Sequence, residues 1–452
     1  MGIAAFVLLL VIEALLAVRT CRKDTEKNTW RRERLIARAA ETGIIVLFTA
    51  LPAGQKWRFV PVMALLLLLL VIAALSALLG KNREDGIKKP VPVILSGLSA
   101  AVLFGIFMIP AFLFTGYSGL PVSGSHPVGR AAAILIDRSR TDPFEEDGSY
   151  REVPVHFYYP EDGKGEKYPL AVFSHGAFGY YESNTSTYME LASNGYVVAA
   201  LDHPHHAFFT EDTGGSTVLV DMDFLNTALN LNSLMTDDQE EYALYRDWMD
   251  LRTGDMGCAV DEIKAAAASG TLSDAWSVSR DEKEAVLQVL AMTDASRIGL
   301  MGHSMGGATS VELGRERDDI AAVIDIDGTM LGEYSGTEKG KFVIRQDPYL
   351  LPLLEFVNWD SYSGLQEHPE LAADYPNTVL MERAAEGFAI TIRDTEHMDY
   401  TDLPLLSPTL GKMLGSGSRG TEETMTIVNS MVLSFFDTYL KGEGSFAAEA
   451  VY

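Results

Sequence analysis

Three residue types in the second half of the chain could together hydrolyse an ester: a serine in a glycine-bounded turn, a histidine and an aspartate. Ser304 lies in Gly302-His303-Ser304-Met305-Gly306, between a short apolar run and a segment with helical character. A strand, a sharp turn and a helix in this order present a serine as a nucleophile, with glycines where a Cβ would clash. The N–H of Met305, at the start of the helix, is placed to stabilise a developing oxyanion.

A serine nucleophile needs a general base that takes its proton. In α/β-hydrolases that histidine follows the serine along the chain, and only His368 and His397 do so here. His368 lies in an irregular polar stretch, whereas His397 follows the predicted strand Gly387–Arg393. We therefore expect His397 to be the base.

Two aspartates are candidates for the acid that orients this histidine. Asp327 ends the predicted strand Ile320–Ile326, the first after the serine, and Asp347 follows the next predicted strand, Lys341–Arg345. Because parallel strands bring their carboxyl ends to one edge of a sheet, either carboxylate could reach His397. The residues alone leave both open.

The segments around these residues predict an α/β fold with a mostly parallel sheet. Residues 131–440 form the predicted catalytic domain, and 117–130 a Gly-, Ser- and Pro-rich linker. Predicted helices include Arg252–Ala268. The acidic stretch Phe209–Asp250 breaks the alternation and predicts a lid-like insertion, with a merely decorative helical pair as the alternative. Residues 441–452 are expected to be a loose tail.

Several short sequences in this domain resemble platelet-activating-factor acetylhydrolases, within the wider class of dienelactone hydrolase-like α/β-hydrolases. They are Tyr158-Tyr159-Pro160, Gly165-Glu166-Lys167-Tyr168-Pro169-Leu170, Phe173-Ser174-His175-Gly176, Gly302-His303-Ser304-Met305-Gly306-Gly307-Ala308, Ile326-Asp327-Gly328, and Ile392-Arg393 followed by His397. The resemblance covers most of residues 128–440 and none of the N-terminal part.

The resemblance implies an α/β-hydrolase fold and cleavage of short or oxidised acyl esters of phospholipids, with neither metal nor cofactor. The family takes its acid from the strand just after the nucleophile, which favours Asp327 over Asp347. Its second oxyanion N–H follows the His-Gly pair and is here that of Ala177. Met305 beside the nucleophile, the acidic insertion and the N-terminal region depart from the family pattern and put the phospholipid substrate in question.

Residues 1–116 have the composition of a membrane region. Apolar segments long enough to span a bilayer are Ile3–Val18, Phe59–Leu79 and Val91–Phe114, and Leu35–Leu51 is a weaker fourth because of Arg38 and Glu41. Four spans would place both basic loops in the cytoplasm and residues 117–452 outside, as the positive-inside rule favours. Cleavage of Ile3–Val18 as a signal peptide is the less favoured alternative.

The charge balance separates the two parts further. The first 116 residues hold 14 of the 36 Lys and Arg and 7 of the 62 Asp and Glu, so the remainder carries a net charge of −33. So acidic a domain is not expected to bind nucleic acid. Two cysteines, with no disulfide between them in this topology, favour a bacterial cell surface over a eukaryotic secretory route.

Three other interpretations stay open at this stage. Asp202-His203-Pro204-His205-His206 could hold a metal, although near-consecutive histidines in a turn rarely converge on one ion. A non-catalytic surface binding protein with this fold usually lacks part of the triad, whereas this chain has a candidate for each member. A transporter or sensor would need more charged groups in its spans than Glu13, Arg38 and Glu41. We therefore expect a membrane-anchored serine ester hydrolase that acts on small-molecule or lipid esters.

Overall fold

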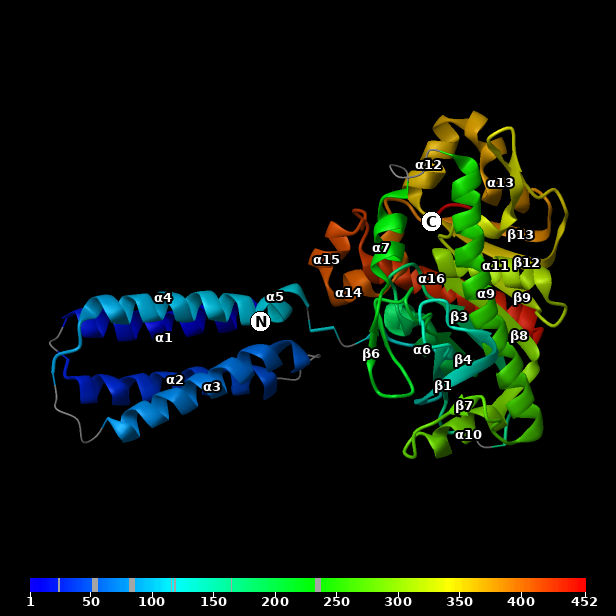
Figure 1. Cartoon of the computed structure of the whole chain (residues 1–452). Helices are drawn as coiled ribbons and strands as arrows, with labels where there is room; N and C mark the ends of the chain where they lie inside the picture. The colour runs from blue at the N-terminus through cyan, green and yellow to red at the C-terminus, as the bar shows by residue number, and fades with distance from the viewer. Residues whose placement is uncertain are drawn as a thin grey trace. The chain divides into compact units, whose positions relative to one another are not determined.

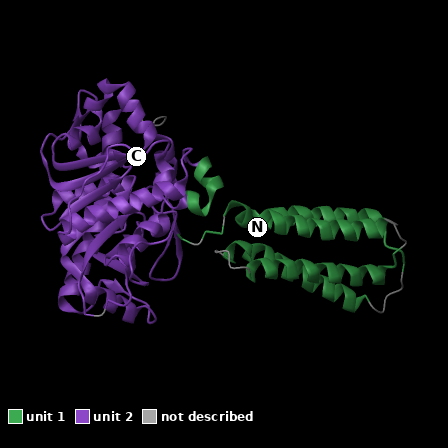
Figure 2. Ribbon diagram, turned by 180° about the vertical axis from the view of Figure 1, so that it is seen from behind, with its two compact units in different colours: residues 1–119, 404–413 green, residues 120–403, 414–452 purple. Residues whose placement is uncertain are grey.

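The computed structural model describes the chain except for residues 23–24, 51–55, 81–85, 115, 118, 164 and 232–236. It contains two compact units, shown in Figures 1 and 2. Unit 1 comprises Met1–Gly119 and Pro404–Met413, and unit 2 comprises Leu120–Leu403 and Leu414–Tyr452. The short helices α14 (Leu403–Leu406) and α15 (Pro408–Met413) thus belong almost entirely to unit 1, although the sequence analysis placed them in the catalytic domain.

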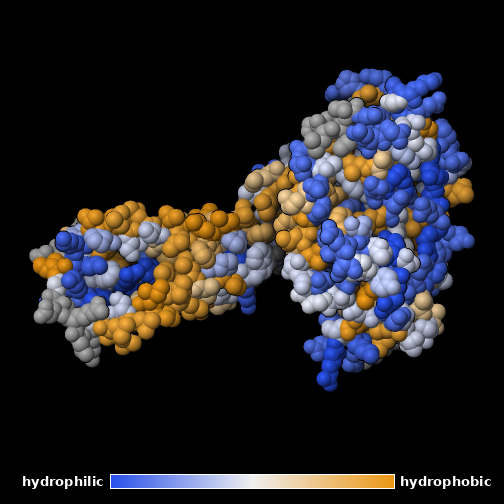
Figure 3. Space-filling view, viewed as in Figure 1, coloured by the Kyte–Doolittle hydropathy of each residue, from blue (hydrophilic) through white to orange (hydrophobic). Residues whose placement is uncertain are grey.

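The described residues of unit 1 form four long helices. Their bounds, with those of the short η1 and α5, are α1 (Gly2–Arg22), α2 (Lys27–Ala50), η1 (Lys56–Phe59), α3 (Val60–Leu79), α4 (Pro90–Phe107) and α5 (Ile109–Leu113). Among the described helices, three stretches are long and apolar enough to cross a membrane: Gly2–Cys21, Lys56–Leu79 and Pro90–Phe107. Apolar side chains cover much of the surface of these helices (Figure 3), as expected of a lipid-facing surface.

The fourth expected span lies in α2, which forms a helix but carries too many charges to belong to that set. Two of its charges are neutralised inside the unit: Arg38 Nη1 lies 2.5 Å from Glu13 Oε1 of α1 and 2.6 Å from Glu41 Oε2. All three side chains are buried, and the pairing offsets part of the cost of removing these charges from water. The predicted segment Val91–Phe114 is also divided, because α4 ends at Phe107 and α5 follows.

Unit 2 is organised around a nine-stranded sheet in the order β13-β12-β9-β8-β3-β4-β2-β1-β7. The strands are β1 (Val128–Thr141), β2 (Tyr150–Pro160), β3 (Tyr168–Ser174), β4 (Val197–Leu201), β7 (Trp276–Ser277), β8 (Thr293–His303), β9 (Ala322–Ile326), β12 (Tyr349–Val357) and β13 (Ala384–Thr391). Pairing is parallel from β13 to β4 and antiparallel from β4 to β7.

Helices cover both faces of this sheet, as predicted for an α/β-hydrolase. Alternate residues of β3 point to opposite faces: Leu170 and Val172 join one buried cluster, Ala171 and Phe173 the other. The first face packs against α9 (Asp238–Ser269), α10 (Lys283–Met292) and α11 (Met305–Glu316), and the second against α6 (Thr185–Ser193) and α16 (Thr421–Phe436). Further α-helices in the described part of unit 2 are α7 (Met222–Leu229), α12 (Trp359–Glu367) and α13 (Pro376–Met381).

One predicted strand belongs elsewhere. Lys341–Ile344 (β11) does not join the main sheet but pairs with β10 (Tyr334–Glu338) in a separate hairpin. The second sheet strand after the serine is instead β12, which the sequence analysis missed. The expectation that Asp347 lies at the carboxyl end of a sheet strand was therefore wrong, because Asp347 precedes β12.

The acidic stretch Phe209–Asp250 is partly continuous with the body of the domain. It contains a small hairpin of β5 (Phe209–Glu211) and β6 (Thr217–Leu219), then α7, then the first part of α9. Helix α9 begins at Asp238, well before the predicted start at Arg252, and its later turns pack on the sheet. The lid assignment stays a prediction.

The C-terminal residues are more ordered than the expected loose tail. After a short π-helix, Asp437–Lys441, the chain returns to the sheet. Phe446 is buried in the second cluster, and Val451 bridges Thr391 at the end of β13. Apolar burial explains the difference, because the tail carries its own aromatic anchor.

Candidate active site

Ser304 occupies a strained turn between β8 and α11. Its backbone has φ 56° and ψ −125°, a conformation that non-glycine residues rarely adopt. A Cβ added to Gly306 would lie 2.0 Å from Ser174 O, and one on Gly302 would lie 2.2 Å from the Gly306 backbone. The two glycines let strand and helix approach closely enough to hold the serine in this turn.

A histidine–aspartate pair lies at the carboxyl ends of β9 and β13. His397 Nδ1 is 2.7 Å from Asp327 Oδ2, and the Asp327 side chain is buried. Burial by itself would lower the pKa of His397, but the hydrogen bond and negative charge of Asp327 raise that pKa above its ordinary value of 6.5. The pair can therefore hold an imidazole ready to accept a proton on its free nitrogen.

Asn358, which the sequence analysis did not single out, fixes the aspartate. Its backbone N–H donates to Asp327 Oδ1 at 2.7 Å, and its Nδ2 donates to Oδ1 at 3.1 Å and Oδ2 at 3.0 Å. Asn358 directly follows β12, the strand that was missed. The Asn358 amide thus lies at the carboxyl end of β12, and it orients the Asp327 carboxylate.

The histidine lies beside the nucleophile turn. The rings of His303 and His397 are 4.6 Å apart, and His303 Nε2 is 3.3 Å from the His397 carbonyl oxygen. Burial lowers the pKa of His303 to about 3, with the His397 charge adding to the effect, so His303 is neutral at pH 7. Within the described residues Ser304 Oγ has no hydrogen-bond partner, as is common before substrate binds.

Two backbone N–H groups beside Ser304 are free to bind an oxyanion. In the described part of the chain, neither the N–H of Ala177 nor that of Met305 has an acceptor. Met305 is the first residue of α11, where N–H groups lack intrahelical partners. The loop of Ala177 abuts the serine, because a Cβ on Gly176 would lie 3.1 Å from Ser304 Cβ.

Asp347 is not part of this group. It lies between β11 and the first residue of β12, whereas Asp327 and Asn358 lie at carboxyl ends of sheet strands. The structure brings together Ser304, Asp327, His397 and the two N–H groups but leaves Asp347 at the amino-terminal end of β12. The geometry favours Asp327 as the acid.

The histidines of residues 203–206 point to different partners. His203 contacts Asp255 and Ser174, His205 stacks on Phe144, and His206 accepts from Arg252. No cluster of three or more His, Cys, Asp or Glu in the described ranges is arranged to hold a metal ion.

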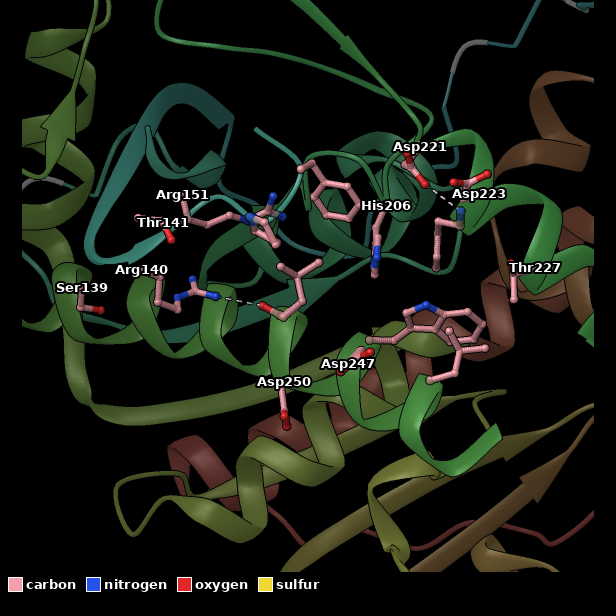
Figure 4. A pocket seen from close by; sticks show the side chains of 16 residues that line it. Ser139, Arg140, Thr141, Arg151, His206, Asp221, Asp223, Thr227, Asp247 and Asp250 are labelled. Atoms are coloured by element: carbon pink, nitrogen blue, oxygen red, sulfur yellow. Dashed lines mark hydrogen bonds between the residues drawn. The ribbon is translucent and has the colours of Figure 1, made fainter. Parts of the chain in front are cut away.

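A hollow of about 800 Å³ in unit 2 is shown in Figure 4. Helices α7 and α9 and the end of β1 form its walls, and none of Ser304, Asp327 and His397 lines it. His206 is one of the residues that line this hollow and are labelled in Figure 4. The candidate site is therefore defined by the His397–Asp327 hydrogen bond and the Ser304 turn and not by this hollow.

The chain is also similar to known proteins. Residues 149–448 match the family model "Platelet-activating factor acetylhydrolase, isoform II". The chain is 24% identical over 290 residues to the platelet-activating factor acetylhydrolase of Cavia porcellus, covering 61% of this chain and 58% of that protein. It is 25% identical over 300 residues to that of Gallus gallus, covering 61% and 63%. The match thus spans less than two thirds of these relatives' own length.

A solved structure also resembles the chain. The ferulic acid esterase from Streptomyces cinnamoneus aligns with a TM-score of 0.52 at 23% identity, covering 73% of this chain and 95% of that one. At this identity the likeness shows the fold, which agrees with the mostly parallel sheet of unit 2.

Proposed function

Because the chain belongs to the platelet-activating factor acetylhydrolase, isoform II family, we propose that it is a serine-dependent carboxylic ester hydrolase. The observation that carries the proposal is the His397–Asp327 pair beside the Ser304 turn, with two unengaged N–H groups at the same place. We take short acyl esters as the substrate class, including acetyl esters of phospholipids, in keeping with the names of the relatives.

The residues support a two-step reaction. Ser304 Oγ attacks the ester carbonyl while His397 Nε2 accepts its proton, and Asp327 stabilises the imidazolium that forms. The N–H groups of Ala177 and Met305 bind the developing oxyanion. His397 then gives the proton to the leaving alcohol, and an acyl group remains on Ser304. Water, activated by the same histidine, releases the acid.

A panel of p-nitrophenyl esters of increasing chain length, with a fluorophosphonate probe, tests the proposal on the full chain in detergent. We expect hydrolysis that falls with acyl length and stoichiometric labelling of Ser304. A folded chain that neither hydrolyses any ester nor takes up the probe would contradict the proposal. That outcome would favour the alternative, a non-catalytic surface binding protein or sensor.

The pH dependence should report the His397–Asp327 pair. Only neutral His397 can accept the serine proton, so kcat/KM should rise with pH through an apparent pKa above 6.5. Asp327→Asn removes the negative charge that helps to raise this pKa, so the rise should shift to lower pH. Profiles from about pH 5 to 9 on a soluble short ester check this. If kcat/KM rises at the same pH in Asp327→Asn as in the wild type, His397 is not the titrating base.

We further propose that unit 1 anchors the protein in a cell membrane as a multi-pass region. The three apolar stretches of unit 1 and their exposed apolar side chains support anchoring. With α2 as a fourth span, both basic loops lie in the cytoplasm and the catalytic domain lies outside. The protein should stay with membranes in alkaline carbonate and be released by detergent. Protease added to intact cells should remove the catalytic domain, and a domain that stays protected would place it inside.

A further inference from the structure

Arg252 of α9 reaches the loop that carries the Ala177 N–H. Its side chain is fully buried, and its guanidinium makes three hydrogen bonds. Nη1 donates to the His175 carbonyl oxygen at 2.5 Å, Nη2 to the Gly176 carbonyl oxygen at 3.4 Å, and Nε to His206 Nδ1 at 3.2 Å. Two consecutive carbonyls before Ala177 are thus held by one side chain.

This guanidinium is unusual because it has no carboxylate of its own. Within the described residues no acidic group lies in ion-pair distance of Arg252, and the carboxylate of Asp255 is bound by Arg151, Arg140 and His203. Burial lowers the pKa of Arg252 to about 9, so the group is still protonated at neutral pH. A charge held without a counter-ion is costly, which indicates that its hydrogen bonds serve another need.

The geometry of the peptide between Gly176 and Ala177 explains what the hydrogen bonds of Arg252 do. In a trans peptide the C=O and N–H point in opposite directions, so the Gly176 carbonyl and the Ala177 N–H are antiparallel. The Gly176 oxygen accepts from Arg252, from Gly179 N at 3.1 Å and from His175 Nδ1 at 2.6 Å. Held on that side, the peptide must point the Ala177 N–H the other way, where no acceptor in the described chain meets it.

The same loop is pressed against the nucleophile. Gly176 packs on Ser304 Cβ so closely that a side chain there would be crowded. The third partner of Arg252 is itself fixed, because His206 stacks on Phe224 with ring centroids 3.7 Å apart and an interplanar angle of 4°. The guanidinium is therefore clamped between a stacked imidazole and the two carbonyls.

We propose that Arg252 is a positioning residue of the oxyanion hole, which aims the Ala177 N–H at the ester oxygen by holding the carbonyls of His175 and Gly176. This inference rests on the proposed hydrolase function. Arg252 touches no reacting atom and exchanges no proton. Its effect should appear only where negative charge develops on the substrate oxygen.

The test compares Arg252→Met and Arg252→Lys with Arg315→Met in the full chain. Arg315 is also poorly exposed but pairs with Glu333 on another helix, so its loss measures destabilisation alone. Per folded molecule, Arg252→Met should lower kcat by about 10²–10³, as removal of an oxyanion donor does, with KM for a short ester nearly unchanged. Arg252→Lys should recover part of the loss, because one ammonium can still hold one carbonyl.

A reversible trifluoromethyl ketone supplies the decisive readout. It forms a tetrahedral oxyanion on the serine, so its Ki should rise in Arg252→Met by the same factor as kcat/KM falls. Equal kcat losses in Arg252→Met and Arg315→Met, or an unchanged Ki, would overturn the proposal.

Hydrogen exchange separates this proposal from the proposed function. Peptides covering residues 175–180 should exchange faster in Arg252→Met than in Arg315→Met, whether or not the chain hydrolyses esters. If the wild-type chain is inactive while this difference appears, the hydrolase function fails and the loop-holding role stands. If the wild-type chain is active and the loop exchanges equally in both variants, the role of Arg252 fails alone.

Discussion

Replacing Ser304 or His397 with alanine should each lower ester turnover by about 10⁶-fold, and the double variant should lose no more. The two side chains act in one step, because the serine is a weak nucleophile until the histidine takes its proton. Once either side chain is removed, the other no longer contributes to the reaction. The residual rate should come from the N–H groups of Ala177 and Met305.

The measurement uses purified full chain, a short p-nitrophenyl ester and circular dichroism to verify folding. Ser310→Ala is the matched control, because Ser310 is a buried serine of α11 whose hydroxyl only donates to the Gly306 carbonyl. It should change turnover by less than about tenfold, since a buried hydroxyl that touches no reacting group contributes only modestly. Losses that multiply in the Ser304→Ala/His397→Ala double variant would mean that the two residues act in separate steps.

The nucleophile turn could be predicted from sequence because its determinants are local. Gly302 is required by a close contact with the backbone of Gly306, within the same short motif. The alternation of apolar strands and helices likewise depends on short segments. Such features need no knowledge of which strand neighbours which.

Strand β12 was missed for an identifiable reason. Its sequence contains Pro352, which argues against a central strand because proline cannot donate to a ladder. In the structure Pro352 pairs only with β13, and pairing with β9 begins at Leu353. The proline therefore lies where the strand has a neighbour on one side only. Without β12, the role of the residue after it, Asn358, could not be inferred.

Arg252 and Asn358 show what sequence patterns do not carry. Asn358 acts on Asp327, 31 residues away, and Arg252 on His175, 77 residues away. Neither spacing has a periodic signature, because the contacts depend on the order of strands in the sheet. A position directly after a strand was the one available signal for Asn358. For Arg252 the signal was a single arginine in the turn of α9 that faces the sheet.

Asp327→Asn is the most informative single substitution in the site. The amide keeps the shape and still accepts a hydrogen bond, but it lacks the charge that stabilises the His397 imidazolium. By analogy with other triads, turnover should fall by about 10²–10⁴. Asp347→Asn should have little effect, because Asp347 lies at the amino-terminal end of β12. Both are compared on a short ester, with folding checked by circular dichroism.

Asn358 provides a graded control for the same site. Asn358→Ala removes the two side-chain hydrogen bonds to Asp327 but keeps the backbone N–H bond and the charge of Asp327, so turnover should fall less than in Asp327→Asn. Asp347→Asn should be the most active of the three variants, Asn358→Ala should be intermediate, and Asp327→Asn should be the least active. An inactive Asp347→Asn beside an active Asp327→Asn would reverse the assignment, because the catalytic charge would then come from a residue that the folded chain holds apart from His397. The 2.7 Å contact between His397 Nδ1 and Asp327 Oδ2 instead predicts that Asp327→Asn is the least active of the three variants.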